Sequence, residues 1–239
     1  TNLAITISNI GDLYSDLGQF DKAEPYVREA MVMLKSLNNK FGLASSYNQL
    51  SDVFILKEEL DSALKYAQAS TGLLKELGYK PELASALMSE GGILRKMKRN
   101  DDGIKKYEEA LGIAAEVGDD VNIMFASMNI GNYLHEQKRW KEAKPLFLKG
   151  SAIGEEKGFH EKLVATYKGL TDIYIKEANL DSVFIYREKY EEALAIGEAY
   201  DFPTIKAMCL GNLGNIFKKQ GEDQDAIKFL NKALEMDEV

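Results

Sequence analysis

Residues 207–236 read AMCLGNLGNIFKKQGEDQDAIKFLNKALEM, and the pattern of this stretch returns along the whole chain. In it, the small residue Ala226 follows the large residue Leu213 after thirteen positions. The small residue recurs about every 40 positions, at Ala23, Ala63, Gly103, Ala143, Val183 and Ala226. The residue thirteen positions earlier recurs in step with it, at Ile10, Leu50, Glu90, Ile130, Leu170 and Leu213. A fixed period of this length predicts a helical solenoid, in which each repeat buries its apolar face only against its neighbours.

Each repeat is predicted to contain two helices joined by a tight turn. Apolar residues in positions 4–17 recur in steps of three and four, which places them on one face of a helix. Gly18 is expected to end this helix. In later repeats Asp61, Asp101 and Asp181 are predicted to cap the second helix, because a carboxylate accepts unpaired backbone N–H groups there. The residues expected in the left-handed conformation after the second helices are Asn38, Gly78, Gly118 and Gly158.

With these residues in place, the chain resembles the tetratricopeptide repeat family. The family motif orders a large apolar residue, Gly, an aromatic residue, Ala, an aromatic residue and Ala. The sixth repeat follows it with Leu213, Gly214, Phe217, Ala226, Leu230 and Ala233, and the third with Gly91, Leu94, Gly103, Tyr107 and Ala110. The resemblance implies an all-α fold, a right-handed superhelical solenoid of six helix-turn-helix repeats with about twelve antiparallel helices.

We expect residues 1–239 to form a single solenoid domain, with repeats at about 4–43, 44–83, 84–123, 124–163, 164–206 and 207–239. The period exceeds the 34 residues of most family members. It resembles a branch with extended helices that includes kinesin light chains, spindle-orientation adaptors and bacterial quorum-peptide receptors. Ile227, Leu230 and Leu234 are predicted to face a helix beyond Val239, so the chain is expected to be a segment of a longer protein with further domains.

Composition argues against several partners. The net charge is −8 and the sequence pI is about 5.0, so the chain would repel a phosphate backbone, and nucleic-acid binding is not expected. No apolar stretch approaches the roughly 18 residues of a membrane span, so this segment is not expected to insert into a membrane. A signal peptide is not visible, and a cytoplasmic location is the working expectation.

Catalytic chemistry is not expected in this segment. The two histidines, His135 and His160, fall at different positions of the repeat, and the single cysteine, Cys209, lies among apolar residues of a first helix. A nucleophilic pair would need one histidine within hydrogen-bond reach of the thiol. No two Cys or His residues fall at ligand spacing for a metal. The sequence therefore predicts no enzyme activity, no metal and no cofactor.

The resemblance points instead to a groove, because the first helices of this family line a concave surface. Two rows of groove positions are rich in amides and carboxylates. They are Asp12, Asp52, Gly92, Asn132, Asp172 and Asn215, and, three residues earlier, Asn9, Gln49, Ser89, Asn129, Gly169 and Asn212. An amide both donates and accepts, so such a ladder can pair with the backbone of an extended peptide. The alternative is that these side chains are solvated or satisfy the neighbouring helix.

A third row, with Lys168, gives the predicted groove a direction from acidic to basic. Its later members are Arg95-Lys96, His135-Glu136, Ile175-Lys176 and Lys218-Lys219. An acidic segment over the third, fifth and sixth repeats would gain association rate and register from these charges. The carboxylate clamp of chaperone-tail binders needs Lys and Asn where this chain has Ser8 and Asp12, so that ligand is not expected. The candidate peptide-binding residues are Asn9, Asp12, Gln49, Asp52, Arg95, Asn129, Asn132, Lys168, Asp172, Lys176, Asn212 and Asn215.

The leading hypothesis is a non-catalytic scaffold that binds a protein or peptide, as the sensing or interaction segment of a larger signalling or transcription-regulatory protein. The alternative is a structural module that holds a multiprotein complex together through its convex or terminal faces. Groove substitutions separate the two, because only the first hypothesis requires the groove for partner binding.

Overall fold

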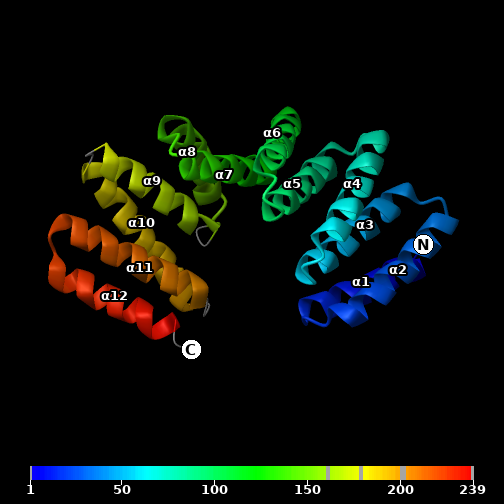
Figure 1. Ribbon diagram of the computed structural model, residues 1–239, viewed down its shortest axis with the longest axis horizontal. Helices are drawn as coiled ribbons and strands as arrows, with labels where there is room; N and C mark the ends of the chain where they lie inside the picture. Colours follow the sequence, from blue (N-terminus) through cyan, green and yellow to red (C-terminus); the bar gives the residue numbers. More distant parts are fainter. Residues whose placement is uncertain (1, 160–161, 178–179, 200–202, 238–239) are drawn as a thin grey trace. The chain divides into compact units, whose positions relative to one another are not determined.

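The computed structural model describes residues 2–159, 162–177, 180–199 and 203–237, and this part of the chain contains twelve α-helices and no strand (Figure 1). The helices are α1 (Asn2–Asp16), α2 (Phe20–Ser36), α3 (Lys40–Leu56), α4 (Leu60–Leu77), α5 (Lys80–Lys96), α6 (Asn100–Val117), α7 (Asp120–Glu136), α8 (Trp140–Glu156), α9 (Val164–Lys176), α10 (Leu180–Ala199), α11 (Pro203–Gln220) and α12 (Asp223–Asp237). The predicted all-α fold of paired helices is confirmed.

Consecutive helices pack against each other from α1 to α6 and from α8 to α12, both within a pair and from one pair to the next. First helices also touch directly, since α1 contacts α3 and α9 contacts α11. The chain divides into two compact parts, residues 1–126 and 127–239, called here the N-terminal half and the C-terminal half. The first helices α1 and α3 therefore lie side by side in the N-terminal half, and α9 and α11 lie side by side in the C-terminal half. None of the described helices is long and apolar enough to cross a membrane.

In the first, third, fourth and sixth repeats, a glycine on the first helix packs against a larger side chain on the second helix. The small residue one position after the first marker faces the residue sixteen positions later. In the fourth repeat, a Cβ on Gly131 would lie 2.7 Å from the Phe147 ring, so only glycine fits. Where the first position carries Ser51, the second is Ala67, and the Ser51 hydroxyl donates to the Ala63 carbonyl at 3.0 Å. The recurring Gly residues are therefore sites of close helix contact.

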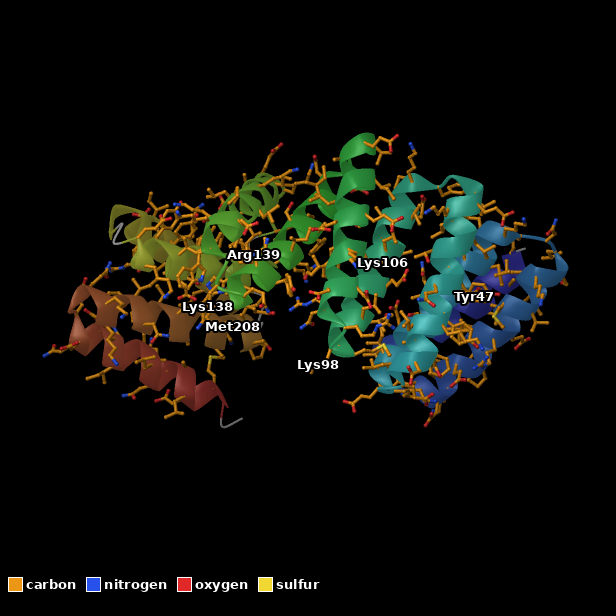
Figure 2. All side chains as sticks on the ribbon, turned by 45° about the horizontal axis from the view of Figure 1, so that its top comes forward. Tyr47, Lys98, Lys106, Lys138, Arg139 and Met208 are labelled. Atoms are coloured by element: carbon orange, nitrogen blue, oxygen red, sulfur yellow. The ribbon has the colours of Figure 1, made fainter. Side chains whose placement is uncertain are left out.

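Glu90 departs from the otherwise apolar first-marker row. Its side chain is 1% exposed, and its carboxylate lies 3.0 Å from the Lys106 ammonium and 3.3 Å from the Thr71 hydroxyl that donates to it. Gln68 donates to the same carboxylate at 3.5 Å. Glu90 thus joins α5 to α4 and α6 by polar contacts, where other repeats use an apolar side chain (Figure 2, Lys106).

The predicted left-handed helix ends are confirmed, with φ of 52° at Asn38 and 69–74° at Gly78, Gly118 and Gly158. The turns inside the pairs use the same geometry. At Lys98 (Figure 2), φ is 63°, and the following N–H of Arg99 donates to the Leu94 carbonyl at 2.9 Å. These backbone bonds satisfy the carbonyls at the end of each first helix.

The prediction that aspartates cap the second helices is wrong for Asp61 and Asp101. The residue before α4 is Glu59 and the residue before α6 is Arg99, and neither side chain makes a capping hydrogen bond. Asp61 and Asp101 lie inside the first turn of their helices. Asp181 likewise follows the first residue of α10. The turn is shorter than the prediction assumed, so the Asp61 and Asp101 carboxylates favour their helices through the helix dipole.

Replacing Lys98 with glycine is expected to raise the free energy of unfolding by about 0.5–1 kcal/mol. A left-handed conformation costs a non-glycine residue roughly 1–2 kcal/mol, and the greater freedom of glycine in the unfolded chain offsets part of the gain. Urea denaturation followed by circular dichroism measures the change. The control is Lys105→Gly, at an exposed position inside α6, which should lower stability by about 0.5–1 kcal/mol. A loss of stability in both variants would contradict the conformational argument.

Candidate functional site

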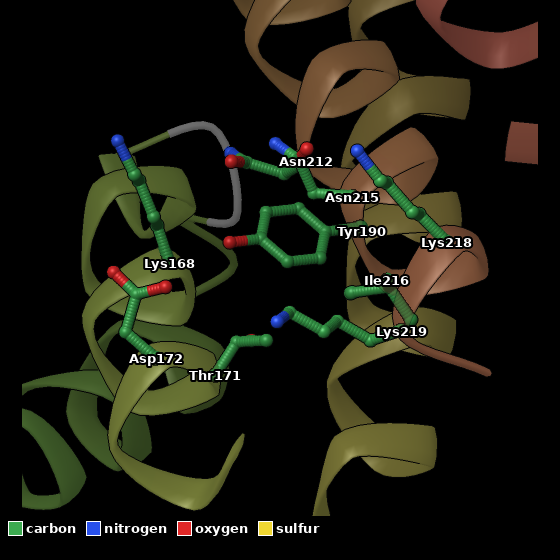
Figure 3. A pocket seen from close by; sticks show the side chains of 9 residues that line it. All are labelled: Lys168, Thr171, Asp172, Tyr190, Asn212, Asn215, Ile216, Lys218 and Lys219. Carbon is green, nitrogen blue, oxygen red and sulfur yellow. The ribbon is translucent and has the colours of Figure 1, made fainter. Parts of the chain in front are cut away.

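A pocket of about 290 Å³ lies in the C-terminal half between α9 and α11, with α10 supplying one wall (Figure 3). Its lining contains four predicted groove residues, Lys168, Asp172, Asn212 and Asn215. It also contains Thr171, Tyr190, Ile216, Lys218 and Lys219. The two predicted rows and the basic row therefore meet at one place on the first-helix surface.

Tyr190 is the residue of α10 that lines this pocket. It occupies the register at which the other repeats have only small residues, Ala30, Ser70, Ala110, Gly150 and Ala233. Its side chain is fully buried, and its ring packs edge-on against Tyr167 with 6.1 Å between centroids. Figure 3 shows the hydroxyl directed into the space between α9 and α11. A buried second-helix side chain thus contributes to the lining of this pocket.

The Tyr190 hydroxyl is buried and has no hydrogen-bond partner among the described residues. Burial raises the pKa of Tyr190 well above its ordinary value, and the neighbouring Thr171 hydroxyl acts in the opposite direction. Thr171 donates its own proton to the Tyr167 carbonyl at 2.8 Å. Tyr190 therefore remains a neutral donor whose proton is available to a ligand.

The charges around the pocket are unevenly paired. Asp172 lies 3.6 Å from the imidazole of His135 on α7. Within the described part of the chain, none of Lys168, Lys218 and Lys219 forms an ion pair. In Figure 3 the Lys219 side chain extends into the gap toward α9, and Lys168 and Lys218 extend along the rim. An anionic group in the gap would meet the Lys219 ammonium there, while Lys168 and Lys218 add positive charge at the rim.

The predicted residues of the N-terminal half form a different arrangement. Gln49 on α3 donates to the Asp12 carboxylate on α1 at 2.8 Å and accepts a hydrogen bond from the Ser8 hydroxyl. Asp52 is exposed to solvent. Partial desolvation, and to a smaller extent the Asp12 carboxylate, raises the pKa of Asp52 to about 6. Burial and Asp16 also raise the pKa of Asp12, while the bond from Gln49 lowers it. Here the amide joins two neighbouring helices, which is the alternative that the sequence left open.

The remaining predicted residues lie outside the lining of this pocket. Asn9 is exposed on α1, and Asn129 and Asn132 are half-buried on α7. Arg95 interacts with the Tyr107 hydroxyl. The Lys176 ammonium lies 4.1 Å from the ring centroid of Trp140. These positions belong to first helices, but the structure does not gather them into the cavity.

Reactive chemistry is not evident in the part of the chain that the structure describes. No group of three or more His, Cys, Asp or Glu residues is placed to hold a metal there. Cys209 is buried, and desolvation raises its pKa to about 12, so its thiol stays protonated. A protonated thiol is a poor nucleophile.

Helix pairs stacked in a regular order define a helical-repeat protein. Two family models described as tetratricopeptide repeat match the chain, one over residues 2–76 and 82–156 and the other over residues 209–239. The chain belongs to the tetratricopeptide repeat family. The sequence comparison with curated proteins gives no match.

Solved structures share the fold at low sequence identity. A signal transduction ATPase with numerous domains and a tetratricopeptide repeat sensor, from Pyrococcus horikoshii, has a TM-score of 0.78 and 21% identity, over 96% of this chain and 35% of that one. BtubC from P. vanneervenii has a TM-score of 0.75 and 19% identity, over 91% and 89%. The apo form of RapI has a TM-score of 0.69 and 16% identity, over 98% and 97%. The chain thus spans about a third of the first of these proteins.

Proposed function

We propose that this chain is a non-catalytic interaction module whose first-helix surface binds an extended segment of a partner protein. The observation that carries the proposal is the pocket between α9 and α11, which is lined by two asparagines, a buried tyrosine hydroxyl and three lysines that form no ion pair among the described residues. Pockets with a few convergent polar groups are the usual binding sites of proteins. Amides on α11 can pair with a peptide backbone, while the lysines favour an acidic segment.

The similar structures support a role of this chain in signalling. The Pyrococcus horikoshii protein is described as a signal transduction ATPase with a tetratricopeptide repeat sensor. A Rap protein, with a TM-score of 0.61 and 15% identity, was solved in complex with Competence and Sporulation Factor. By analogy, the chain would be the sensing or interaction segment of a larger signalling or regulatory protein, with its output located in another domain.

A second candidate is a structural assembly module. The observation that favours it is the exposed apolar surface on the outermost helices of each half. Leu13 on α1 and Leu17 just after it are 63% and 68% exposed, and Ile227 and Leu234 on α12 are 59% and 60% exposed. Exposed apolar side chains that gather on one helix often mark protein contacts. In this case the partner would bind these helices, and the pocket would play no part.

The double variant Asn132→Ala, Asn215→Ala tests the choice. If the first-helix surface binds the partner, the variant is expected to weaken binding by at least about tenfold, because two side chains that pair with the peptide backbone are lost. Isothermal titration with the partner, or with a peptide selected from a display library, measures the effect. The control pair is Ile227→Ser with Leu234→Ser, which changes only exposed residues of the second helix α12. Loss of binding in the control alone would favour the assembly module.

A further inference from the structure

The pocket between α9 and α11 offers more donors than the protein itself uses. At its floor, the fully buried Tyr190 hydroxyl lacks an acceptor among the described residues. A buried donor without a partner destabilises a fold, and an acceptor brought by a ligand would remove this cost. Figure 3 shows this hydroxyl facing the open space of the pocket. The ligand is therefore expected to present an acceptor oxygen at this depth.

The net charge of the residues that line the pocket indicates which class of ligand would supply this acceptor oxygen. Lys168, Lys218 and Lys219 contribute three positive charges, and Asp172 contributes one negative charge, so the pocket has a net charge of about two positive units at pH 7. The amides of Asn212 and Asn215 add neutral donors. A single carboxylate would neutralise only half of this charge. A phosphate monoester carries about −1.5 to −2 charges at pH 7 and has three strong acceptor oxygens.

The dimensions of the pocket agree with a group of this size. Its volume of about 290 Å³ corresponds to roughly ten water molecules at about 30 Å³ each. This is enough for a phosphorylated side chain, with its phosphate at the Tyr190 hydroxyl and its stem toward the rim. Lysine ammonium groups bind phosphate as point charges and need no fixed planar geometry.

We propose that this pocket binds a phosphoryl group, either on a phosphorylated side chain of the bound segment or as a free phosphate ion. The proposal rests on the proposed function, since it names the group that the first-helix surface takes from its partner. Tyr190 donates its hydroxyl proton to a phosphate oxygen, Lys219 neutralises charge inside the gap, and Lys168 and Lys218 attract the anion at the rim.

Isothermal titration with three probes tests the proposal. The probes are inorganic phosphate, the peptide acetyl-Ala-phosphoserine-Ala-amide, and acetyl-Ala-Glu-Ala-amide as the carboxylate analogue. Phosphate or the phosphopeptide is expected to bind one site at least about tenfold more tightly than the glutamate peptide. Tighter binding of the phosphopeptide than of phosphate would assign the group to a modified side chain, and the reverse would assign it to the free ion.

Substitutions locate the binding and separate it from a structural role. Tyr190→Phe is expected to weaken phosphate binding by about tenfold or more, because a hydrogen bond to a charged group is lost, while the unfolding midpoint stays equal or rises. Lys219→Met should weaken binding to a similar extent. The control is Tyr186→Phe, which removes a hydroxyl from a buried tyrosine of α10 outside the pocket and should leave binding unchanged.

Two results would overturn the inference. One is equal binding of the glutamate peptide and the phosphopeptide. The other is phosphate binding that survives both Tyr190→Phe and Lys219→Met. If either occurs while Asn132→Ala with Asn215→Ala still abolishes partner binding, the phosphoryl assignment fails and the groove proposal stands. If phosphate binds as expected but the asparagine variant leaves partner binding intact, the proposed function fails instead.

Discussion

The variant Phe147→Ala is expected to lower the free energy of unfolding of the C-terminal half by about 3–5 kcal/mol. Phe147 on α8 is fully buried. Its ring lies between two glycines, since a Cβ on Gly131 would come within 2.7 Å of it and a Cβ on Gly169 within 2.5 Å. Removing the ring leaves a cavity between α7 and α9 that neither glycine can fill. Guanidinium denaturation followed by the fluorescence of Trp140, the only tryptophan, measures the loss.

Two further variants test whether the cavity is the cause. Leu148 is the next residue on α8 and is 40% exposed, so Leu148→Ala should cost less than about 1 kcal/mol. Gly131→Ala should destabilise the wild-type protein, because the added methyl group meets the ring, but should be tolerated beside Phe147→Ala. Equal losses for Phe147→Ala and Leu148→Ala would argue against a core built around this ring.

In the N-terminal half, Lys106→Met is expected to lower the free energy of unfolding by about 3 kcal/mol. The substitution removes the cation that lies 3.0 Å from the Glu90 carboxylate, whose side chain is only 1% exposed. An uncompensated buried charge typically costs about 3–5 kcal/mol, and the lower end applies because Lys106 is 32% exposed. Thermal and urea denaturation of the purified protein measure the change.

The double variant Glu90→Leu, Lys106→Met provides the sharper comparison. It restores an apolar residue of the type found in the other repeats and leaves no charge unpaired, so its stability should be close to that of the wild type. Lys105→Met, at an exposed position on the same helix, should change stability by less than about 0.5 kcal/mol. If the double variant were as unstable as Lys106→Met, the unpaired carboxylate would not be the cause.

The sequence predicted the helices and their ends well because the same residue types recur at equivalent positions of successive repeats. The positions after the second helices are glycine or asparagine, and they adopt the left-handed conformation in the structure. The aspartate caps were wrong for a physical reason. Backbone bonds such as Arg99 N–H to the Leu94 carbonyl close the turn, so the next helix has already begun when Asp101 is reached.

The candidate site was predictable only in part. Lys168, Asp172, Asn212 and Asn215 stand in rows that follow from the repeat, and they line the pocket. Tyr190 was missed because it lies on a second helix, outside those rows. The available signal was its size, since the other repeats have a small residue in this register. Sequence alone does not show that the Tyr190 hydroxyl is buried and has no hydrogen-bond partner among the described residues.

The pairing of Gln49 with Asp12 was also beyond the sequence. Amides that donate to a solvent-exposed peptide and amides that donate to the adjacent helix occupy the same row. Only the geometry between α1 and α3 distinguishes them, and it favours the internal hydrogen bond at this position. In the C-terminal half, Asn212 and Asn215 instead face the cavity.

Site-specific photocrosslinking tests the central claim most directly. A benzoylphenylalanine residue is placed at the exposed Lys218 on the rim of the pocket or, as the comparison, at the exposed Lys228 on α12 outside it. With a bound partner or selected peptide, Lys218→benzoylphenylalanine is predicted to crosslink and Lys228→benzoylphenylalanine is not. Crosslinks from position 228 alone would contradict a ligand surface on the first helices.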